Sequence, residues 1–157
     1  MHIRLYRPAD TDAVVRLALK AWVPVFASIR DTLAPDVYET FYPDGWEAHQ
    51  QRDVEAALNE QTAWVAELDG SVVGFVTVVL HEEDALGEIH MIATDPDRQQ
   101  QGIGGALTKH ALAWMHAQGV TLAMVETGGD PGHAPARRTY ERAGFGRWPV
   151  ARYFKKL

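Results

Sequence analysis

The chain has 157 residues and a mass of 17.5 kDa, so we expect a single domain over residues 1–157. Hydrophobic residues make up 46% and charged residues 23%, which excludes a disordered chain, and the lack of cysteine excludes a disulfide framework, a cysteine nucleophile and a thiolate metal site. The net charge of −6 argues against nucleic acid as the main partner, because binding to phosphates needs a basic surface.

The charge is distributed unevenly along the chain. Residues 131–157 carry seven basic residues and one acidic residue, a net +6, whereas the first 130 carry eight basic and twenty acidic, a net −12. Either a functional gradient or an unevenly charged solvated surface explains this. No apolar run approaches the roughly 20 residues of a membrane span, and charged residues occupy the place of a signal peptide, so we expect a cytoplasmic protein with no membrane partner.

The first part of the chain predicts one short strand and several helices. Alternating apolar residues predict a strand over residues 2–6. Apolar residues at helical spacing predict a helix from residue 9 to about 29, which Pro24 kinks or divides into two. A second helical stretch, from 36 to about 61, is interrupted near residues 43–45.

Strands dominate the middle of the chain. Residues 62–68 and 72–80 predict two strands joined in a tight hairpin at Asp69-Gly70, because both of these turn residues can take positive φ. The acidic stretch 81–84 predicts a loop, and residues 88–94 predict a further strand.

The last third alternates helices and strands. The pattern predicts a helix over 102–117, a strand over 120–126, a helix over 134–143 stopped by Gly144, and one or two final strands within 145–154. The order of elements predicts an α/β (α+β) fold, with a mixed central sheet and helices on both of its faces.

The most informative pattern lies where a strand ends and a helix begins. Gly102, Gly104 and Gly105 fall in the first helical turn, although each glycine costs about 0.8–1.0 kcal/mol relative to alanine inside a helix. Absent Cβ atoms let a ligand approach the backbone, and first-turn N–H groups lack intrahelical partners, which suits a phosphate. The spacing does not fit a P-loop, because no lysine follows the glycines at the required position. It does not fit the fingerprint Gly-x-Gly-x-x-Gly either, because Leu107 stands where the third glycine would be. A loop packed closely against the sheet is the alternative.

Two motifs resemble those of the Gcn5-related N-acetyltransferase (GNAT) family. Residues 99–104, Gln-Gln-Gln-Gly-Ile-Gly, resemble its acyl-CoA signature Gln/Arg-x-x-Gly-x-Gly/Ala, and residues 136–145, Ala-Arg-Arg-Thr-Tyr-Glu-Arg-Ala-Gly-Phe, resemble Ala-x-x-x-Tyr-x-x-x-Gly-Phe. The resemblance covers most of the chain. It implies a mostly antiparallel sheet splayed between strands 4 and 5, and direct transfer of an acetyl group from acetyl-CoA to a primary amine of a small molecule, peptide or protein.

The resemblance also implies the residues that hold acetyl-CoA. Backbone N–H groups of the glycine turn would bind the diphosphate, and the end of the preceding strand would bind the pantetheine and acetyl group. His133 stands where many members have an asparagine that contacts the cofactor, and Arg137 or Arg138 would pair with a cofactor phosphate. The implied cofactor-binding residues are Ile92, Ala93, Thr94, Gln99, Gln100, Gln101, Gly102, Ile103, Gly104, Gly105, His133 and Arg137.

Acyl transfer to an amine needs a base and an acid, because only about one part in a thousand of a lysine-like amine is neutral at pH 7. The resemblance implies that Tyr140 protonates the departing CoA sulfur, with helix packing as its alternative role. Strand alternation puts Glu88 and His90 on one face, as candidate bases. Glu88 resembles a strand glutamate used by some members, whereas a histidine titrates nearer to neutral pH.

The acceptor side is less defined. Six aromatic residues between Trp22 and Trp46 are interleaved with carboxylates and would suit a cationic amine, although amphipathic helices bury such residues for packing alone. The histidine spacing predicts no metal site, and two serines without a nucleophile-elbow motif predict no hydrolase. A catalytically silent acyl-CoA-binding module that acts through a protein partner is the alternative function. Dimers are frequent in the family, which leaves a homodimer open.

Overall fold

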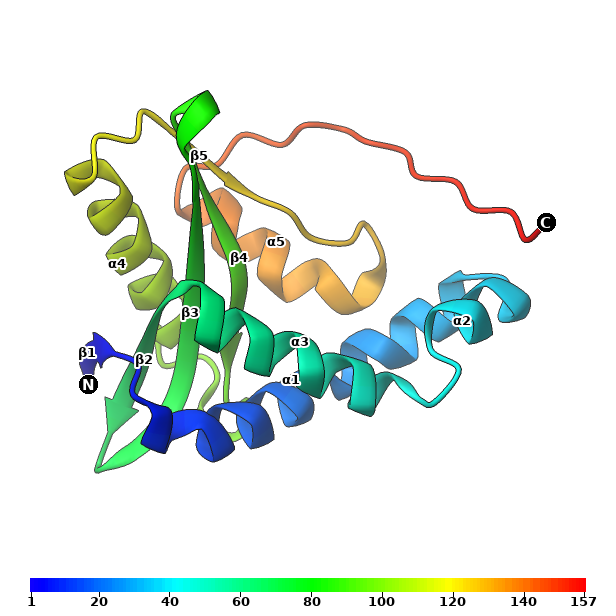
Figure 1. The fold of residues 1–157 in the computed structure, drawn as a ribbon, viewed down its shortest axis with the longest axis horizontal. Coiled ribbons are helices and arrows are strands. Elements are labelled where there is room, and N and C mark those ends of the chain that lie inside the picture. The colour runs from blue at the N-terminus through cyan, green and yellow to red at the C-terminus, as the bar shows by residue number, and fades with distance from the viewer.

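The computed structural model describes all residues from 1 to 157 and contains one five-stranded sheet with helices on both faces (Figure 1). The strands lie in the order β1 to β5; β1 to β4 pair antiparallel, and β4 and β5 pair parallel. This arrangement confirms the expected mixed, mostly antiparallel sheet. The strands are β1 (His2–Leu5), β2 (Thr62–Leu68), β3 (Ser71–His81), β4 (Leu86–Thr94) and β5 (Leu122–Val125), and the helices are α1 (Thr11–Thr32), α2 (Pro35–Phe41), α3 (Trp46–Glu60), α4 (Ile103–Ala117) and α5 (Ala134–Arg142).

Each face of the sheet has its own hydrophobic core. Helices α1 and α3 cover one face, where Val14 and Val54 pack with Phe75 of β3. Helix α4 covers the other face, where Leu107 packs with Val76, the next residue of β3. The two neighbours on β3 enter different cores because successive strand side chains point to opposite faces. Helices α1 and α4 therefore lie on opposite faces of the sheet.

The predicted hairpin is confirmed. Asp69 and Gly70 join β2 to β3 with φ values of 52° and 76°, the positive values that a tight turn of this kind requires. The interruption predicted near residues 43–45 is also present, since α2 ends at Phe41 and α3 begins at Trp46.

Helix α1 is not divided at Pro24, contrary to one of the two expectations. It continues from Thr11 to Thr32 with Pro24 inside it. Residues on both sides of the proline, such as Leu17 and Phe26, are buried. Burial of these side chains along the whole helix outweighs the one backbone hydrogen bond that proline removes.

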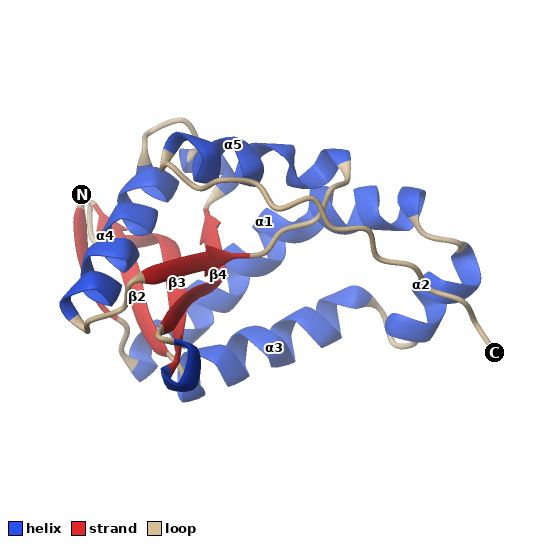
Figure 2. Ribbon diagram, turned by 90° about the horizontal axis from the view of Figure 1, so that it is seen from above, coloured by secondary structure: helices blue, strands red, loops and turns tan.

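The final strands predicted within residues 145–154 are wrong. No strand follows β5, and the chain beyond α5 runs as an irregular extended segment from the end of α5 toward α2 (Figures 1 and 2). Its few contacts include the ring of Phe154 on that of Phe41, with centroids 5.0 Å apart, and an ion pair of 2.6 Å between Arg152 and Glu126. The segment has the composition of a strand but no strand partner.

None of the helices combines the length and the apolar character that crossing a membrane would require.

Candidate active site

The sheet opens between β4 and β5 (Figure 1). The parallel ladder joins only residues 86–89 of β4 to residues 122–125 of β5, while β4 continues to Thr94. Residues 90–94 therefore have no ladder partner on the β5 side. Three of the predicted cofactor-binding residues, Ile92, Ala93 and Thr94, lie on this unpaired stretch, whose main-chain groups on that edge are free to bind a ligand.

The first turn of α4 begins just beyond the end of β4. Gly102 precedes the helix in a left-handed conformation, with φ of 77°, and no side chain caps the helix. The N–H of Ala106 is the first to bond back, to the carbonyl of Gly102 at 2.9 Å. The amides of Ile103, Gly104 and Gly105 thus form the usual set of first-turn donors without intrahelical acceptors. The neighbouring residues 99–102 are exposed.

Packing does not explain the glycines of this turn. The positive φ of Gly102 favours glycine, but Gly104 and Gly105 have no positive φ. A Cβ on Gly104 would come no closer than 3.6 Å, to Thr94 Oγ1, and a Cβ on Gly105 would meet nothing within 4 Å. A loop packed closely against the sheet would leave no such space. The geometry favours the ligand explanation for these two positions, because only something outside the chain gains from the missing side chains.

The loop between β5 and α5 is fastened to α1. Ser28 of α1 donates a hydrogen bond of 2.6 Å to Asp130, and the ring of His133 bonds to the other oxygen of the same carboxylate. Burial alone would raise the pKa of Asp130, but the hydrogen bonds from Ser28 and His133 outweigh it and hold this pKa below its usual value. A Cβ on Gly132 would lie 2.7 Å from that of Ser28, so the loop approaches α1 very closely. These contacts hold the loop after β5 against α1.

Arg137 and His133 are both engaged within the protein. The guanidinium of Arg137 donates to the carbonyl oxygens of Gly128 and Asp130, at 2.5 and 2.8 Å, and therefore supports the loop. The side chain of Arg138 is exposed, so it is more available than Arg137 to bind a phosphate. With Nδ1 of His133 bonded to Asp130, Nε2 is the ring nitrogen left for a ligand.

Tyr140 lies on α5, and its side chain is buried. Its ring packs edge-on against Phe145, with centroids 6.1 Å apart. Burial raises the pKa of the Tyr140 hydroxyl to about 12, so the phenol stays protonated at neutral pH. A protonated donor suits the predicted acid, and the same burial suits the packing alternative.

A β-bulge shapes the strand that carries the two candidate bases. Thr77 pairs with Met91 and Val78 with Ile89, which leaves His90 as an extra residue. Ile89 packs toward α4, so Glu88 points to the face covered by α1 and α3. The ring of His90 bonds to Gln61 at the end of α3, which places it near the same face.

Sequence reasoning missed a partner of Glu88. Nε2 of His81 lies 2.8 Å from Oε2 of Glu88. The sequence assigned His81 to an acidic loop, but β3 extends to include it, and the 3-10 turn covers only Glu82–Asp84. Because Glu88 pairs with Val79, His81 stands two residues along on the same face, at the diagonal position. Only the strand register reveals this neighbour.

The aromatic residues of the predicted acceptor region pack mostly against one another. The rings of Phe26 and Trp46 stack with centroids 4.4 Å apart, and both are buried together with Tyr38. This supports packing as the role of these three. Phe41 is exposed, and Trp22 and Tyr42 are partly exposed, so these three are the members available to a ligand. Trp22 also packs on Phe75, with ring centroids 6.3 Å apart.

The chain is similar to known acetyltransferases. The family model described as "Acetyltransferase (GNAT) family" matches residues 28–145. A mycothiol acetyltransferase of Stackebrandtia nassauensis is 28% identical over 162 residues, which cover 94% of this chain and 51% of the relative. A mycothiol acetyltransferase of Streptomyces coelicolor is 39% identical over 82 residues, 52% of this chain and 26% of the relative. The chain thus spans about half the length, or less, of these curated relatives.

Solved structures share the fold over nearly the whole chain. A putative GNAT-family acetyltransferase from Desulfovibrio desulfuricans has a TM-score of 0.71 and 25% identity, and the match covers 95% of this chain and 87% of that one. A GNAT-family acetyltransferase from Brucella melitensis in complex with acetyl-CoA has a TM-score of 0.62 and 21% identity, and covers 93% and 82%.

Proposed function

Because the chain belongs to the GNAT acetyltransferase family, we propose that it transfers the acetyl group of acetyl-CoA directly to a primary amine. The observation that carries this proposal is the uncapped, glycine-lined first turn of α4 beside the unpaired edge of β4. Curated relatives are named as acetyltransferases, and one similar structure holds acetyl-CoA, which supports acetyl-CoA as the donor.

The cofactor would lie across the opening between β4 and β5. The first-turn amides of α4 would hold the diphosphate, with Gln99, Gln100 and Gln101 at its border, because backbone donors and the helix dipole both favour an anion there. The unpaired groups of Ile92, Ala93 and Thr94 would hold the pantetheine and acetyl group. His133 Nε2 and the exposed Arg138 would contact the cofactor, while Arg137 holds the loop.

The reaction would proceed by attack of the neutral amine on the thioester carbon. A main-chain N–H of β4 would stabilise the oxyanion, a contribution that is worth about 2.7–4 kcal/mol per donor in other enzymes. Glu88 would remove the proton of the amine, directly or through water, and His90 is the second candidate base. As the C–S bond breaks, Tyr140 would give its proton to the sulfur, which leaves free CoA and the acetylated amine.

Two measurements on the purified chain test this proposal. Calorimetry should show binding of acetyl-CoA, and release of CoA thiol should depend on an added amine from a chemically diverse panel. Binding without amine-dependent thiol release would identify the alternative, a silent acyl-CoA-binding module. Well-folded protein with no affinity for CoA or its thioesters would refute both.

The identity of the acceptor is a separate proposal. The exposed ring of Phe41 and the partly exposed ring of Tyr42, followed two residues later in sequence by Asp44, suit a cationic amine. Amines that carry a second positive charge should therefore react faster than neutral amines of the same size, and a preference for acidic acceptors would contradict this.

We also propose that the chain works as a homodimer. The cytoplasmic location expected from the sequence stays a prediction.

A further inference from the structure

Helix α1 contacts the chain on both sides of the opening between β4 and β5. Lys20 of α1 reaches the turn that joins β4 to α4, and Ser28 of the same helix reaches the loop that joins β5 to α5. The two residues are eight positions apart in sequence, which is about 12 Å along the helix axis. Figure 2 shows α1 running lengthwise between α3 and α5. One helix therefore joins the two segments that border the proposed cofactor site.

The contact on the β4 side is made by charges. Nζ of Lys20 lies 3.1 Å from Oδ1 of Asp95 and 2.5 Å from Oδ2 of Asp97. Asp95 directly follows β4, and its carboxylate also accepts a hydrogen bond of 3.0 Å from the N–H of Asp97. This hydrogen bond and the contact with Lys20 outweigh burial and hold the pKa of Asp95 below its usual value. Lys20 thus joins the two carboxylates at the start of the turn that leads to the glycines.

The conformation of this turn explains why it needs such a contact. Gln100 and Gly102 both have positive φ, of 63° and 77°. Positive φ is costly for Gln100, because it carries a side chain, and such a conformation persists only where the surroundings hold it. Residues 97–102 are all exposed, so no hydrophobic core holds them in place. The ion pairs of Lys20 supply a contact from outside the turn.

The contact on the β5 side is a hydrogen bond to a buried carboxylate. Ser28 donates to Oδ2 of Asp130, whose side chain is 9% exposed, and the N–H of Gly132 donates back to the hydroxyl of Ser28 at 2.9 Å. A Cβ on Gly132 would lie 3.1 Å from the carbonyl oxygen of Pro24, so the loop lies on about one turn of α1. His133, the candidate cofactor contact, bonds to the same carboxylate. Ser28 therefore fixes the loop that places His133.

We propose that α1 sets the distance between the two sides of the acetyl-CoA site, with Lys20 and Ser28 as positioning residues. Lys20 holds the turn whose amides would bind the diphosphate, and Ser28 holds the loop that carries His133. Neither residue needs to touch the cofactor. A site with both sides already in place binds more tightly, because less ordering is needed when the ligand arrives. This inference rests on the proposed cofactor site, but the distance between the two sides is measurable without any ligand.

Spin labels test the proposal in the free protein. The chain has no cysteine, so Arg98→Cys and Gly129→Cys place one label on the exposed turn and one on the exposed loop. A Cβ at Gly129 meets nothing within 4 Å, so a side chain fits there. The distance distribution between the labels should shift or broaden in Lys20→Met and in Ser28→Ala. An unchanged distribution in either variant would overturn the proposal.

Helix α1 offers a matched control for each variant. Arg16 lines the same cavity as Lys20 one turn earlier but makes no ion pair, so Arg16→Met is the control for Lys20→Met. Thr32 donates its hydrogen bond only to the carbonyl of Ser28 within the helix, so Thr32→Ala is the control for Ser28→Ala. Both controls should keep the original distribution of distances. Equal changes in controls and variants would reduce the effect to general loosening of α1 and refute the proposal.

Affinity and turnover separate positioning from loss of fold. By calorimetry, Lys20→Met should raise the Kd for acetyl-CoA about two- to fivefold, the effect of an exposed ion pair. Ser28→Ala should raise it by roughly tenfold or more, because it removes a hydrogen bond to a charged group. At saturating acetyl-CoA, kcat should change little in both, since neither residue takes part in the chemistry. A fall in kcat with an unchanged Kd would contradict a positioning role.

A charge reversal tests the ion pair itself. Lys20→Glu should weaken the binding of acetyl-CoA more than Lys20→Met does, because it repels both carboxylates, and adding Asp97→Lys should restore much of the affinity and the original label distances. Absence of this rescue would exclude the ion pair as the cause. If the unmodified chain bound no acetyl-CoA, the proposed function would fail, and the label distances would still decide whether α1 sets the distance between the two sides.

Discussion

Tyr140 shows how the surroundings of a single residue set its chemistry. Burial raises the pKa of its hydroxyl to about 12, which keeps the proton on the phenol but makes it a weaker acid. A thiolate that forms in the same low-polarity surroundings becomes a stronger base for the same reason, so transfer of the proton remains feasible.

Tyr140→Phe should lower kcat by about 10²–10⁴-fold, the usual contribution of an acid–base group, and leave the affinity for acetyl-CoA unchanged. The ring that packs on Phe145 is kept in this variant, so packing is preserved. Steady-state kinetics together with calorimetry would measure both quantities. Unchanged turnover would assign Tyr140 to packing alone.

The raised pKa of Tyr140 also predicts how the free energy of unfolding changes at alkaline pH. The tyrosine pKa is about 10 in the unfolded chain and about 12 at Tyr140 in the fold, so between these values the unfolded state loses a proton that the folded state keeps. The free energy of unfolding should therefore fall as the pH rises from about 10 to 12. Tyr140→Phe should lose part of this slope in urea titrations at several pH values, and an identical slope would contradict the shift.

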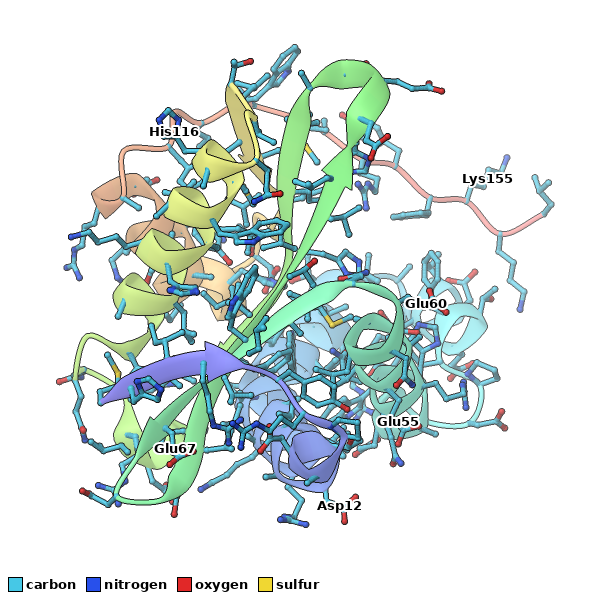
Figure 3. The ribbon with its side chains drawn as sticks, turned by 60° about the vertical axis from the view of Figure 1, so that its left-hand side comes forward. Asp12, Glu55, Glu60, Glu67, His116 and Lys155 are labelled. Atoms are coloured by element: carbon cyan, nitrogen blue, oxygen red, sulfur yellow. The ribbon has the colours of Figure 1, made fainter.

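His81 and Glu88 form a pair whose function depends on both members. We expect His81→Ala to lower kcat but not the KM for acetyl-CoA, because a hydrogen bond of 2.8 Å from His81 orients the proposed base. In the Glu88→Gln background the same change should have little further effect, giving a coupling energy of about 0.5–3 kcal/mol. His116→Ala, on exposed α4 surface, is the control (Figure 3). Additive effects would show that the two act separately, and full turnover of Glu88→Gln would place the base elsewhere.

At the scale of elements, the sequence predicted the turns and helix ends that depend only on neighbouring residues. The hairpin at Asp69-Gly70, the two breaks after Phe41 and at Gly144, and the glycine turn before α4 all follow from residues adjacent in sequence. The bulge at His90 does not, because it appears only when β4 is paired with β3. The bond between Ser28 and Asp130 joins residues 102 apart, beyond the reach of any periodicity.

The missing final strands have a related cause. Composition alone shows that the segment beyond α5 can be a strand, but a strand also needs an edge to pair with, and the course of the chain after α5 leads past β5 toward α2. Likewise, Pro24 marks a weak point in α1, while the cores on both sides of it decide that the helix continues.

The glycine turn of α4 predicts a conflict between stability and binding. Gly105→Ala should stabilise the free protein by up to about 1 kcal/mol, because the new methyl group meets nothing within 4 Å and alanine favours a helix. It should also weaken the binding of acetyl-CoA, since the methyl would stand where the diphosphate approaches the backbone. Thermal unfolding and calorimetry would show the two effects. Gly146→Ala, equally free of neighbours, should leave affinity unchanged. If Gly105→Ala bound acetyl-CoA normally, the diphosphate site would lie elsewhere.

At the scale of the whole molecule, the buried residues are divided unequally between the two sides of the opening between β4 and β5. Residues up to Met115 supply both cores, whereas Tyr140 alone is buried among residues 116–157. Elements with few buried contacts open locally at a lower free energy than the core does. The side formed by β5 and α5 therefore depends on the Ser28–Asp130 contact, on the short ladder to β4, and on whatever ligand spans the opening.

Acetyl-CoA should consequently order one side of the molecule more than the other. Without it, amide hydrogens of β5 and α5 should exchange faster than those of β2 and β3. At about 100 times its dissociation constant, a ligand adds about 2.7 kcal/mol to stability. Because the cofactor would contact the first turn of α4 and the start of α5 together, hydrogen exchange measured by mass spectrometry should slow mainly in residues 122–142. Uniform slowing over the whole chain would mean that the two sides already unfold as one unit, and slowing confined to β2 and β3 would place the ligand away from the opening.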